Sequence, residues 1–107
     1  MVPEAIFADP IVADPKHYRV LFENEKVRIL KISYGPFEQG NMHGHPDCVL
    51  VTLTEMNATF SYPDGKTEEV DVLGKVAAFM PNTNHAGLVR TATRFEGILV
   101  EIKPRGE

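Results

Sequence analysis

The segment Met42-His43-Gly44-His45-Pro46-Asp47 dominates the interpretation of this sequence, together with Pro81-Asn82-Thr83-Asn84-His85 further along the chain. Three of the four histidines lie in these two stretches, and His43 and His45 are one residue apart. In an extended strand, residues i and i+2 point to the same face, with Cα atoms roughly 7 Å apart. Two imidazoles placed in this way can share one ion, and His85 from a neighbouring strand would complete the set. Because neutral imidazole is the commonest metal ligand in proteins, the pattern predicts a metal site with three histidines and an open position.

The sequence around these histidines alternates between apolar and polar residues. Val49, Val51 and Leu53 alternate with threonines, which predicts a strand whose valine face also carries His43 and His45. Short strands are also expected at residues 20–23, 27–34, 58–62, 67–72, 76–80, 86–90 and 95–103. No stretch longer than a turn has helical periodicity. The pattern therefore predicts an all-β fold, and it leaves open whether the strands form a sandwich or a barrel.

The first residues differ from the rest of the chain in composition. They contain Pro3, Pro10 and Pro15, and the last two of these prolines follow aspartates. Proline disfavours helix at the residue before it. We therefore expect residues 1–18 to form an extended arm in front of a β-strand domain at residues 19–107. Apolar residues between Ile6 and Val12 are expected to anchor this arm to a sheet or to a partner subunit.

Length and charge exclude several classes of protein. A chain of 107 residues forms one domain with a modest core. Its 11 basic and 15 acidic residues give a net charge of -4 without any basic run, which argues against nucleic-acid binding. Cys48 is the only cysteine, so no intrachain disulfide can form and a reducing compartment is expected. The sequence also lacks the features of a signal peptide and any apolar run of membrane-spanning length, so we expect a soluble cytoplasmic protein.

The histidine segments also resemble a known family. Gly40-Asn41-Met42-His43-Gly44-His45, followed by Gly74 and Pro81-Asn82-Thr83-Asn84-His85, is similar to the two signature motifs of the small single-domain cupins. The resemblance extends over roughly residues 19 to 103, and Asp14-Pro15-Lys16-His17-Tyr18 is similar to the lead-in of many bacterial members. It implies a double-stranded β-helix, a jelly-roll barrel that holds a divalent metal near its open mouth. The implied ligands are His43, His45 and His85.

The sequence departs from the family pattern at the fourth ligand. The cupin motif carries a glutamate shortly after its second histidine, whereas Val49 and Leu50 stand in that region here. Thr83 replaces the usual glycine of the second motif, and Gly74 lies one residue further from Pro81 than is common. Three neutral imidazoles would leave a divalent ion with its full charge beside an apolar wall. Such a centre should attract an anionic, chelating small molecule.

The resemblance implies two kinds of enzyme. One is a dioxygenase that uses ferrous iron, and the other is a Lewis-acid catalyst of isomerisation or elimination. A third interpretation is a non-catalytic binding or regulatory module. Iron, zinc, nickel, copper and manganese all accept imidazole ligands, so the sequence leaves the metal open. No catalytic residue can be identified from the sequence.

The other polar, apolar and aromatic residues near these motifs are expected to have structural roles. Asp47 follows a proline and is expected to be a turn residue. Cys48 is expected to be a small buried thiol that faces away from the site, and His17 a solvated side chain in the arm. Glu68 and Glu69 are expected on the surface. Residues expected to line the barrel or the core are Met42, Met80, Phe60, Phe79 and Tyr62.

The resemblance also implies self-association. Small barrels of this kind often pair through sheet edges, and the arm from Ile6 to Val12 could cover an exposed edge. We therefore expect a homodimer.

Overall fold

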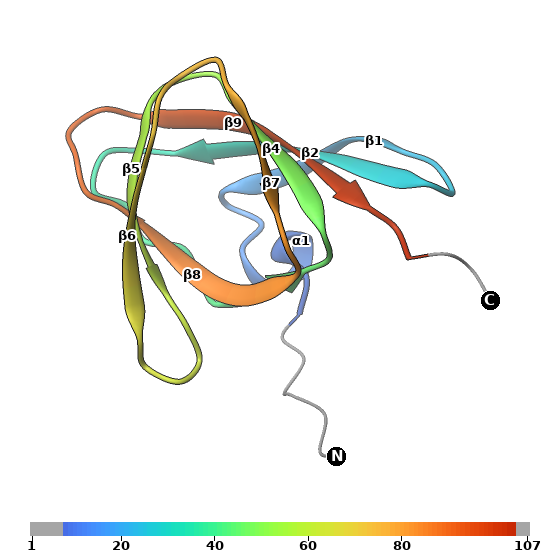
Figure 1. Ribbon diagram of the computed structural model, residues 1–107, viewed down its shortest axis with the longest axis horizontal. Helices are drawn as coiled ribbons and strands as arrows, with labels where there is room; N and C mark the ends of the chain where they lie inside the picture. The colour runs from blue at the N-terminus through green and yellow to red at the C-terminus, as the bar shows by residue number, and fades with distance from the viewer. Residues whose placement is uncertain (1–7, 105–107) are drawn as a thin grey trace.

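The computed structural model describes residues 8–104, and its regular structure is almost entirely β-strand (Figure 1). The elements are α1 (Pro10–Ala13), β1 (Tyr18–Glu23), β2 (Val27–Tyr34), β3 (His43–His45), β4 (Cys48–Thr52), β5 (Met56–Ser61), β6 (Thr67–Val72), β7 (Ala77–Met80), β8 (Thr83–Val89) and β9 (Phe95–Ile102). The predicted all-β class is confirmed. Among residues 8–104, no helix has the length and apolar character needed to cross a membrane.

Two antiparallel sheets form the molecule. The first has the strand order β1-β2-β9-β4-β7, and the second has the order β3-β8-β5-β6. Figure 1 shows the second sheet folded across the first, so that one face of each sheet points inward. Leu30, Leu50 and Leu99 from the first sheet and Ala58 and Val89 from the second belong to one buried cluster. This arrangement is the predicted double-stranded β-helix.

The expectation of an extended arm is wrong at residues 10–13, which form helix α1. Asp9 caps this helix, because its Oδ1 accepts a hydrogen bond from Ile11 N at 2.8 Å. Pro10 occupies the first helical position, where its missing N–H costs nothing. Ile11 packs against the core of its own chain, whereas Val12 is exposed. Of the expected anchors, Ile6 and Phe7 lie outside the described residues.

The expectation of a solvated His17 is also wrong, because this side chain is only 4% exposed. Its Nδ1 lies 2.9 Å from Asp14 Oδ1, and its Nε2 lies 3.2 Å from Glu38 Oε1. The ring stacks on Tyr34 with centroids 3.9 Å apart. Carboxylates at both ring nitrogens satisfy the polar atoms of the buried ring, which is what burial of such a group requires. His17 thereby connects the segment after α1 to the loop after β2.

Gly40, the glycine of the first motif, lies where this cluster meets the second sheet. Its N–H donates to Gly87 O at 2.8 Å. A Cβ at residue 40 would lie 2.5 Å from Asp14 Oδ2 and closer still to Tyr34 Oη. The motif glycine is therefore required by the close approach of two buried polar side chains.

Candidate metal centre

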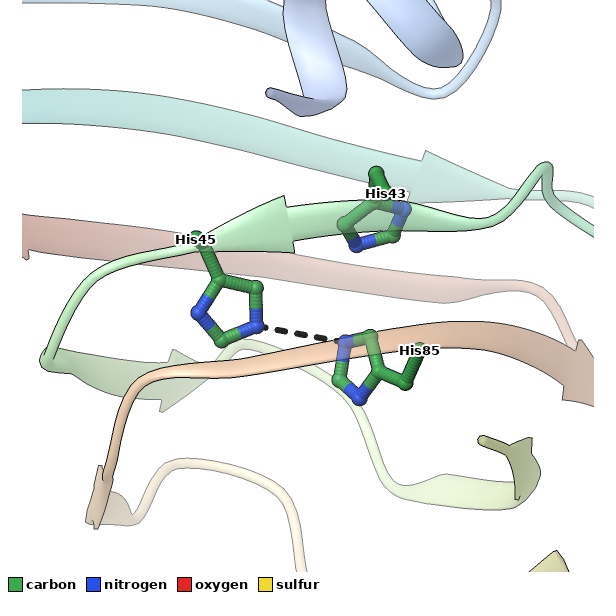
Figure 2. Close-up of side chains that lie close together, drawn as sticks. All are labelled: His43, His45 and His85. Atoms are coloured by element: carbon green, nitrogen blue, oxygen red, sulfur yellow. Dashed lines mark hydrogen bonds between the residues drawn. The ribbon is translucent and has the colours of Figure 1, made fainter. Parts of the chain in front are cut away.

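The three predicted ligands come together on two paired strands, as Figure 2 shows. In the antiparallel register of β3 and β8, His43 lies opposite His85, and His45 lies opposite Thr83. His43 and His45 share the inward face of β3 because they are two residues apart, while Gly44 between them is half-buried. Gly44 N donates to Ala8 O at 2.9 Å, so the segment before α1 holds the free edge of β3. The predicted convergence of the three imidazoles is confirmed.

The imidazoles have the spacing of a ligand set. One nitrogen from each ring can be chosen so that all three atoms lie within 4.8 Å of one another. His45 Nε2 is 3.2 Å from His85 Nε2, which is the contact drawn in Figure 2. The exposed fractions of His43, His45 and His85 are 1%, 6% and 5%. Three buried nitrogen ligands this close together could hold a metal ion.

Hydrogen bonds to the backbone orient two of the rings. His43 Nδ1 donates to Asn41 O at 2.9 Å, and His45 Nδ1 donates to Pro46 O at 3.1 Å. Each Nε2 therefore carries a lone pair, as in metal-ligating histidines whose other nitrogen is held by a carbonyl. His43 Nε2 is buried without a hydrogen-bond partner. Because a buried polar atom without a partner is costly, this orphaned nitrogen fits a bound cation.

The surroundings keep the imidazoles neutral. Burial lowers the pKa values of His43 and His45 below the usual 6.5. Burial also lowers the pKa of His85, to about 3, and the neighbouring His45 and His43 add to this effect. Neutral imidazole is the form that binds metals, so the rings are ready to act as ligands at pH 7 without losing a proton.

We predict that the metal-free protein loses stability on mild acidification. Between the unfolded pKa of 6.5 and the folded value of about 3, the unfolded chain binds a proton at His85 that the folded chain does not. Stability should therefore fall as the pH drops from 7 to 5, by about 2 kcal/mol from His85 alone. Urea unfolding at the two pH values measures this difference. His85→Gln should reduce it, and equal stability of the wild type at pH 7 and pH 5 would contradict the prediction.

A pocket opens beside the histidines. Its volume is about 520 Å³ when the open mouth is counted. His45, His85, Tyr18 and Tyr34 line the pocket together with apolar side chains. Its apolar and glycine lining consists of Ile32, Leu50, Met56, Ala58, Phe60, Met80, Gly87, Leu88, Val89, Phe95 and Leu99. A small molecule bound there would reach the histidines through an apolar passage.

The predicted orientation of β4 is wrong. Cys48, Leu50 and Thr52 are the buried residues of this strand, whereas Val49 is only half-buried and Leu53 is exposed. Pro46 and Asp47 separate β3 from β4, so the alternation does not continue in phase from His45. Leu50, and not Val49, therefore faces the pocket in the region of the missing motif glutamate.

Cys48 is buried as predicted, but it does not face away from the histidines. Its Sγ lies 3.5 Å from His45 Nδ1. Burial raises the pKa of the Cys48 thiol to about 12, so the neutral thiol predominates at pH 7. Cys48 thus packs behind His45 as a neutral side chain.

We predict that Leu50→Glu adds a fourth ligand to the site. Leu50 is 4% exposed, so a carboxylate there should destabilise the metal-free protein by several kcal/mol, because burying an unpaired charge is costly. Added Zn²⁺ should reverse this loss and raise the melting temperature of the variant by more than that of the wild type. Thermal unfolding with and without Zn²⁺ measures both effects. Val49→Glu is the matched control, and an equal response to zinc in the two variants would contradict the assignment.

The other sequence-based predictions have mixed outcomes. Asp47 is a bend residue as predicted, and its Oδ1 accepts a hydrogen bond from Asn82 N at 2.8 Å. Phe60 and Met80 line the pocket, as predicted, whereas the prediction that Phe79 lies inside is wrong, because this side chain is 61% exposed. Tyr62 lies beside His85, with ring centroids 6.4 Å apart. Met42 is half-buried, and Glu68 and Glu69 are exposed, as expected.

Sequence reasoning missed the polar side of the pocket. Tyr18 and Tyr34 line it; Tyr34 donates a hydrogen bond to Asp14, and Tyr18 is hydrogen-bonded to Tyr34. The signal in the sequence is the segment Asp14-Pro15-Lys16-His17-Tyr18, which resembles the cupin lead-in and overlaps the expected arm. A buried Glu101 on β9, with Oε1 bonded to Arg28 Nε at 2.8 Å, was also not anticipated.

The fold and the three-histidine cluster together define a cupin-type barrel with a candidate metal site. This chain is similar to a cupin domain from Bordetella pertussis Tohama I, with a TM-score of 0.75 and 24% identity. The match covers 81% of this chain and 92% of the Bordetella chain. A cupin superfamily protein from Desulfitobacterium hafniense DCB-2 matches over 81% and 76% of the two chains, with a TM-score of 0.60 and 14% identity. These likenesses establish the cupin fold.

A further similar structure is an enzyme described with its metal. Fe(II)-HppE with an alternative substrate has a TM-score of 0.61 and 14% identity, and the match covers 78% of this chain and 48% of that one. No protein-family model matches the sequence, and no curated protein matches it either.

Proposed function

We propose that this protein binds a divalent metal ion through His43, His45 and His85 and acts as a dioxygenase on an anionic, chelating small molecule. The observation that carries the proposal is the convergence of three buried imidazoles in which two rings donate through Nδ1 to backbone carbonyls. The Fe(II) state of the structurally similar HppE supports iron as the metal. When bound, ferrous iron supplies positions at which an organic anion and dioxygen can meet.

The side chains of the pocket determine what such a site can accept. Three neutral ligands would leave the charge of a divalent ion uncompensated, because Leu50 occupies the pocket wall where a carboxylate could stand. An anionic oxygen of the substrate would supply the missing negative charge. The apolar walls would exclude water and strengthen that attraction. Because His45 and His85 line the pocket, an ion held by the three histidines would be within reach of a molecule bound there.

Oxygen consumption tests the proposed reaction. Protein loaded with Fe(II) under nitrogen should consume dioxygen when mixed with at least one member of a panel of β-dicarbonyl and thiol-carboxylate compounds. The same protein loaded with Zn²⁺ should not, since zinc has no redox chemistry. Absence of uptake across the panel at full iron occupancy would reject the dioxygenase and leave the metal site standing.

One observation favours a second function, non-catalytic binding of a small molecule at the metal. Among the described residues that line the pocket, none is an aspartate or a glutamate, so no carboxylate there can act as an acid or base. A protein of this kind would bind the chelating anion as an Fe(II) complex without consuming oxygen. Lewis-acid isomerisation would instead change the compound without oxygen, which product analysis under nitrogen detects.

We also propose that two copies pair along β1. This edge strand exposes Val20, Leu21 and Phe22, whose exposed fractions are 43%, 48% and 51%. Antiparallel pairing about a two-fold axis at Leu21 would place Arg19 of one copy opposite Glu23 of the other, a favourable cross-strand charge pair.

Leu21→Lys should therefore convert the dimer into a monomer by introducing like charges at the axis. Sedimentation velocity of the variant and the wild type measures this change. Leu73→Lys, at a residue that is 73% exposed and lies outside the strands, is the matched control. A monomeric wild type at high micromolar concentration would contradict the pairing.

A further inference from the structure

Two tyrosines on the pocket wall belong to a hydrogen-bonded chain that ends at a buried carboxylate. Tyr18 Oη lies 3.3 Å from Tyr34 Oη, and Tyr34 Oη lies 3.2 Å from Asp14 Oδ2. Both tyrosines line the pocket. The Tyr18 ring meets the His43 ring edge-on, with centroids 5.1 Å apart. The chain therefore begins beside the candidate metal site and ends at Asp14.

The direction of the hydrogen bonds in this chain follows from the number of protons available. A carboxylate only accepts, and a phenol has a single hydrogen to donate. Tyr34 donates its hydrogen to Asp14, so its oxygen can only accept from Tyr18. Tyr18 must then donate to Tyr34. The Tyr18 oxygen consequently has lone pairs, and no hydrogen, left for a molecule in the pocket.

The surroundings hold this direction in place. Asp14 is 2% exposed, and His17 Nδ1 contacts both of its oxygens, at 2.9 and 3.0 Å. Burial raises the pKa values of Tyr18 and Tyr34 above their usual value of 10, so both phenols keep their hydrogens at neutral pH. Gly40 leaves the space in which Tyr34 and Asp14 meet. The chain therefore cannot reverse without protonation or replacement of Asp14.

We propose that Tyr18 determines the specificity of the pocket by accepting a hydrogen bond from the bound molecule, so that the site selects chelating anions with a hydroxyl group over their keto analogues. This inference rests on the proposed metal site. The ligand class is a small carboxylate with an adjacent hydroxyl donor and an apolar body. The carboxylate would bind the ion, the hydroxyl would donate to Tyr18, and the body would contact side chains such as Leu50 and Phe60.

Two probes that share a skeleton test this specificity. Mandelate carries a hydroxyl group beside its carboxylate, and benzoylformate carries a keto group at the same position. Their dissociation constants are measured by titration calorimetry with zinc-loaded protein. The ratio of the two constants in the wild type is compared with the ratio in Tyr18→Phe, so that any intrinsic preference of zinc cancels. We expect the ratio to favour mandelate about tenfold more in the wild type than in the variant, the size expected of one hydrogen bond.

Two further variants separate this effect from a general loss of packing. Tyr62→Phe removes a hydroxyl from a ring near His85 and should leave the ratio unchanged, because the Tyr62 hydroxyl donates to Glu68. Asp14→Asn should shift the preference toward benzoylformate. The amide introduced there can donate to Tyr34, which frees Tyr34 to donate to Tyr18 and Tyr18 to donate to the pocket.

The outcomes distinguish the two levels of inference. Failure of the wild type to bind zinc would overturn the proposed metal site itself. Stoichiometric zinc with the same ratio in the wild type and Tyr18→Phe would overturn the role of Tyr18 alone, and so would the absence of binding of both probes. A loss of mandelate preference in Tyr18→Phe with no loss in Tyr62→Phe would support it, even if Asp14→Asn does not fold.

Discussion

Replacement of His43 by alanine is expected to abolish stoichiometric metal binding. His43 is 1% exposed, and its buried Nε2 has no hydrogen-bond partner, as expected of a nitrogen that holds an ion. Removal of one of three ligands leaves two imidazoles. The affinity for a divalent ion should therefore fall by at least about a hundredfold, which is more than the loss typical of mutating a residue that only hydrogen-bonds to a ligand. Elemental analysis of protein purified without an affinity tag and without chelators measures the metal content per chain.

The matched control for this experiment is Tyr62→Phe. This change is also made on a ring close to His85, but it removes no candidate ligand. It should retain the metal content of the wild type, and both variants should show the circular dichroism of a folded β protein. Full metal occupancy in His43→Ala would show that the three imidazoles are not the ligand set.

Replacement of Gly40 by alanine is expected to destabilise the protein strongly, although it adds only a single methyl group. The added Cβ would lie 2.5 Å from Asp14 Oδ2 and closer still to Tyr34 Oη, and both side chains are held by buried hydrogen bonds. Moving either one breaks a contact of a buried polar group and adds the cost of overpacking. We expect a loss of about 3 kcal/mol or more. Urea unfolding followed by circular dichroism measures it.

Gly87→Ala is the matched control, because Gly87 pairs with Gly40 through a backbone hydrogen bond but has more room. Its nearest neighbour to an added Cβ is Phe60, at an ordinary contact distance of 3.5 Å. This variant should lie within about 1 kcal/mol of the wild type, since alanine has less backbone entropy to lose than glycine. Similar losses in the two variants would contradict the steric explanation of the motif glycine.

The fold and the convergence of the histidines could be predicted because both depend on local periodicity. A spacing of two residues places His43 and His45 on one face of any strand, whatever the rest of the fold. The orientation of β4 could not be predicted, because it depends on the bend at Asp47. The side chain of Asp47 accepts a hydrogen bond from Asn82 N, at a distance of 35 residues along the chain. Alternation predicts that a strand exists, but a bend between two strands can change which face turns inward.

The burial of His17 illustrates a second limit. Its contact with Asp14 is local, but Glu38 is 21 residues away and Tyr34 lies on β2. Only the tertiary fold brings these groups together, and a histidine in a proline-rich segment gives no sign of it. The tertiary fold also brings together the hydrogen-bonded chain from Tyr18 to Asp14, because Tyr18 lies on β1, Tyr34 on β2 and Asp14 at the end of α1. Sequence periodicity thus located the candidate ligands but not the hydrogen bonds that orient their surroundings.

The contacts of His17 have a consequence for how the segment that follows α1 is held on the barrel. One imidazole, held between Asp14 and Glu38, fastens this region to the barrel without any covalent cross-link. Because the chain has a single cysteine, the attachment does not depend on the thiol redox state of its surroundings. Reducing agents should therefore leave it intact, whereas strong acid should weaken it by protonating Glu38, whose pKa the neighbouring Lys16 and the Gly35 N–H lower to about 2.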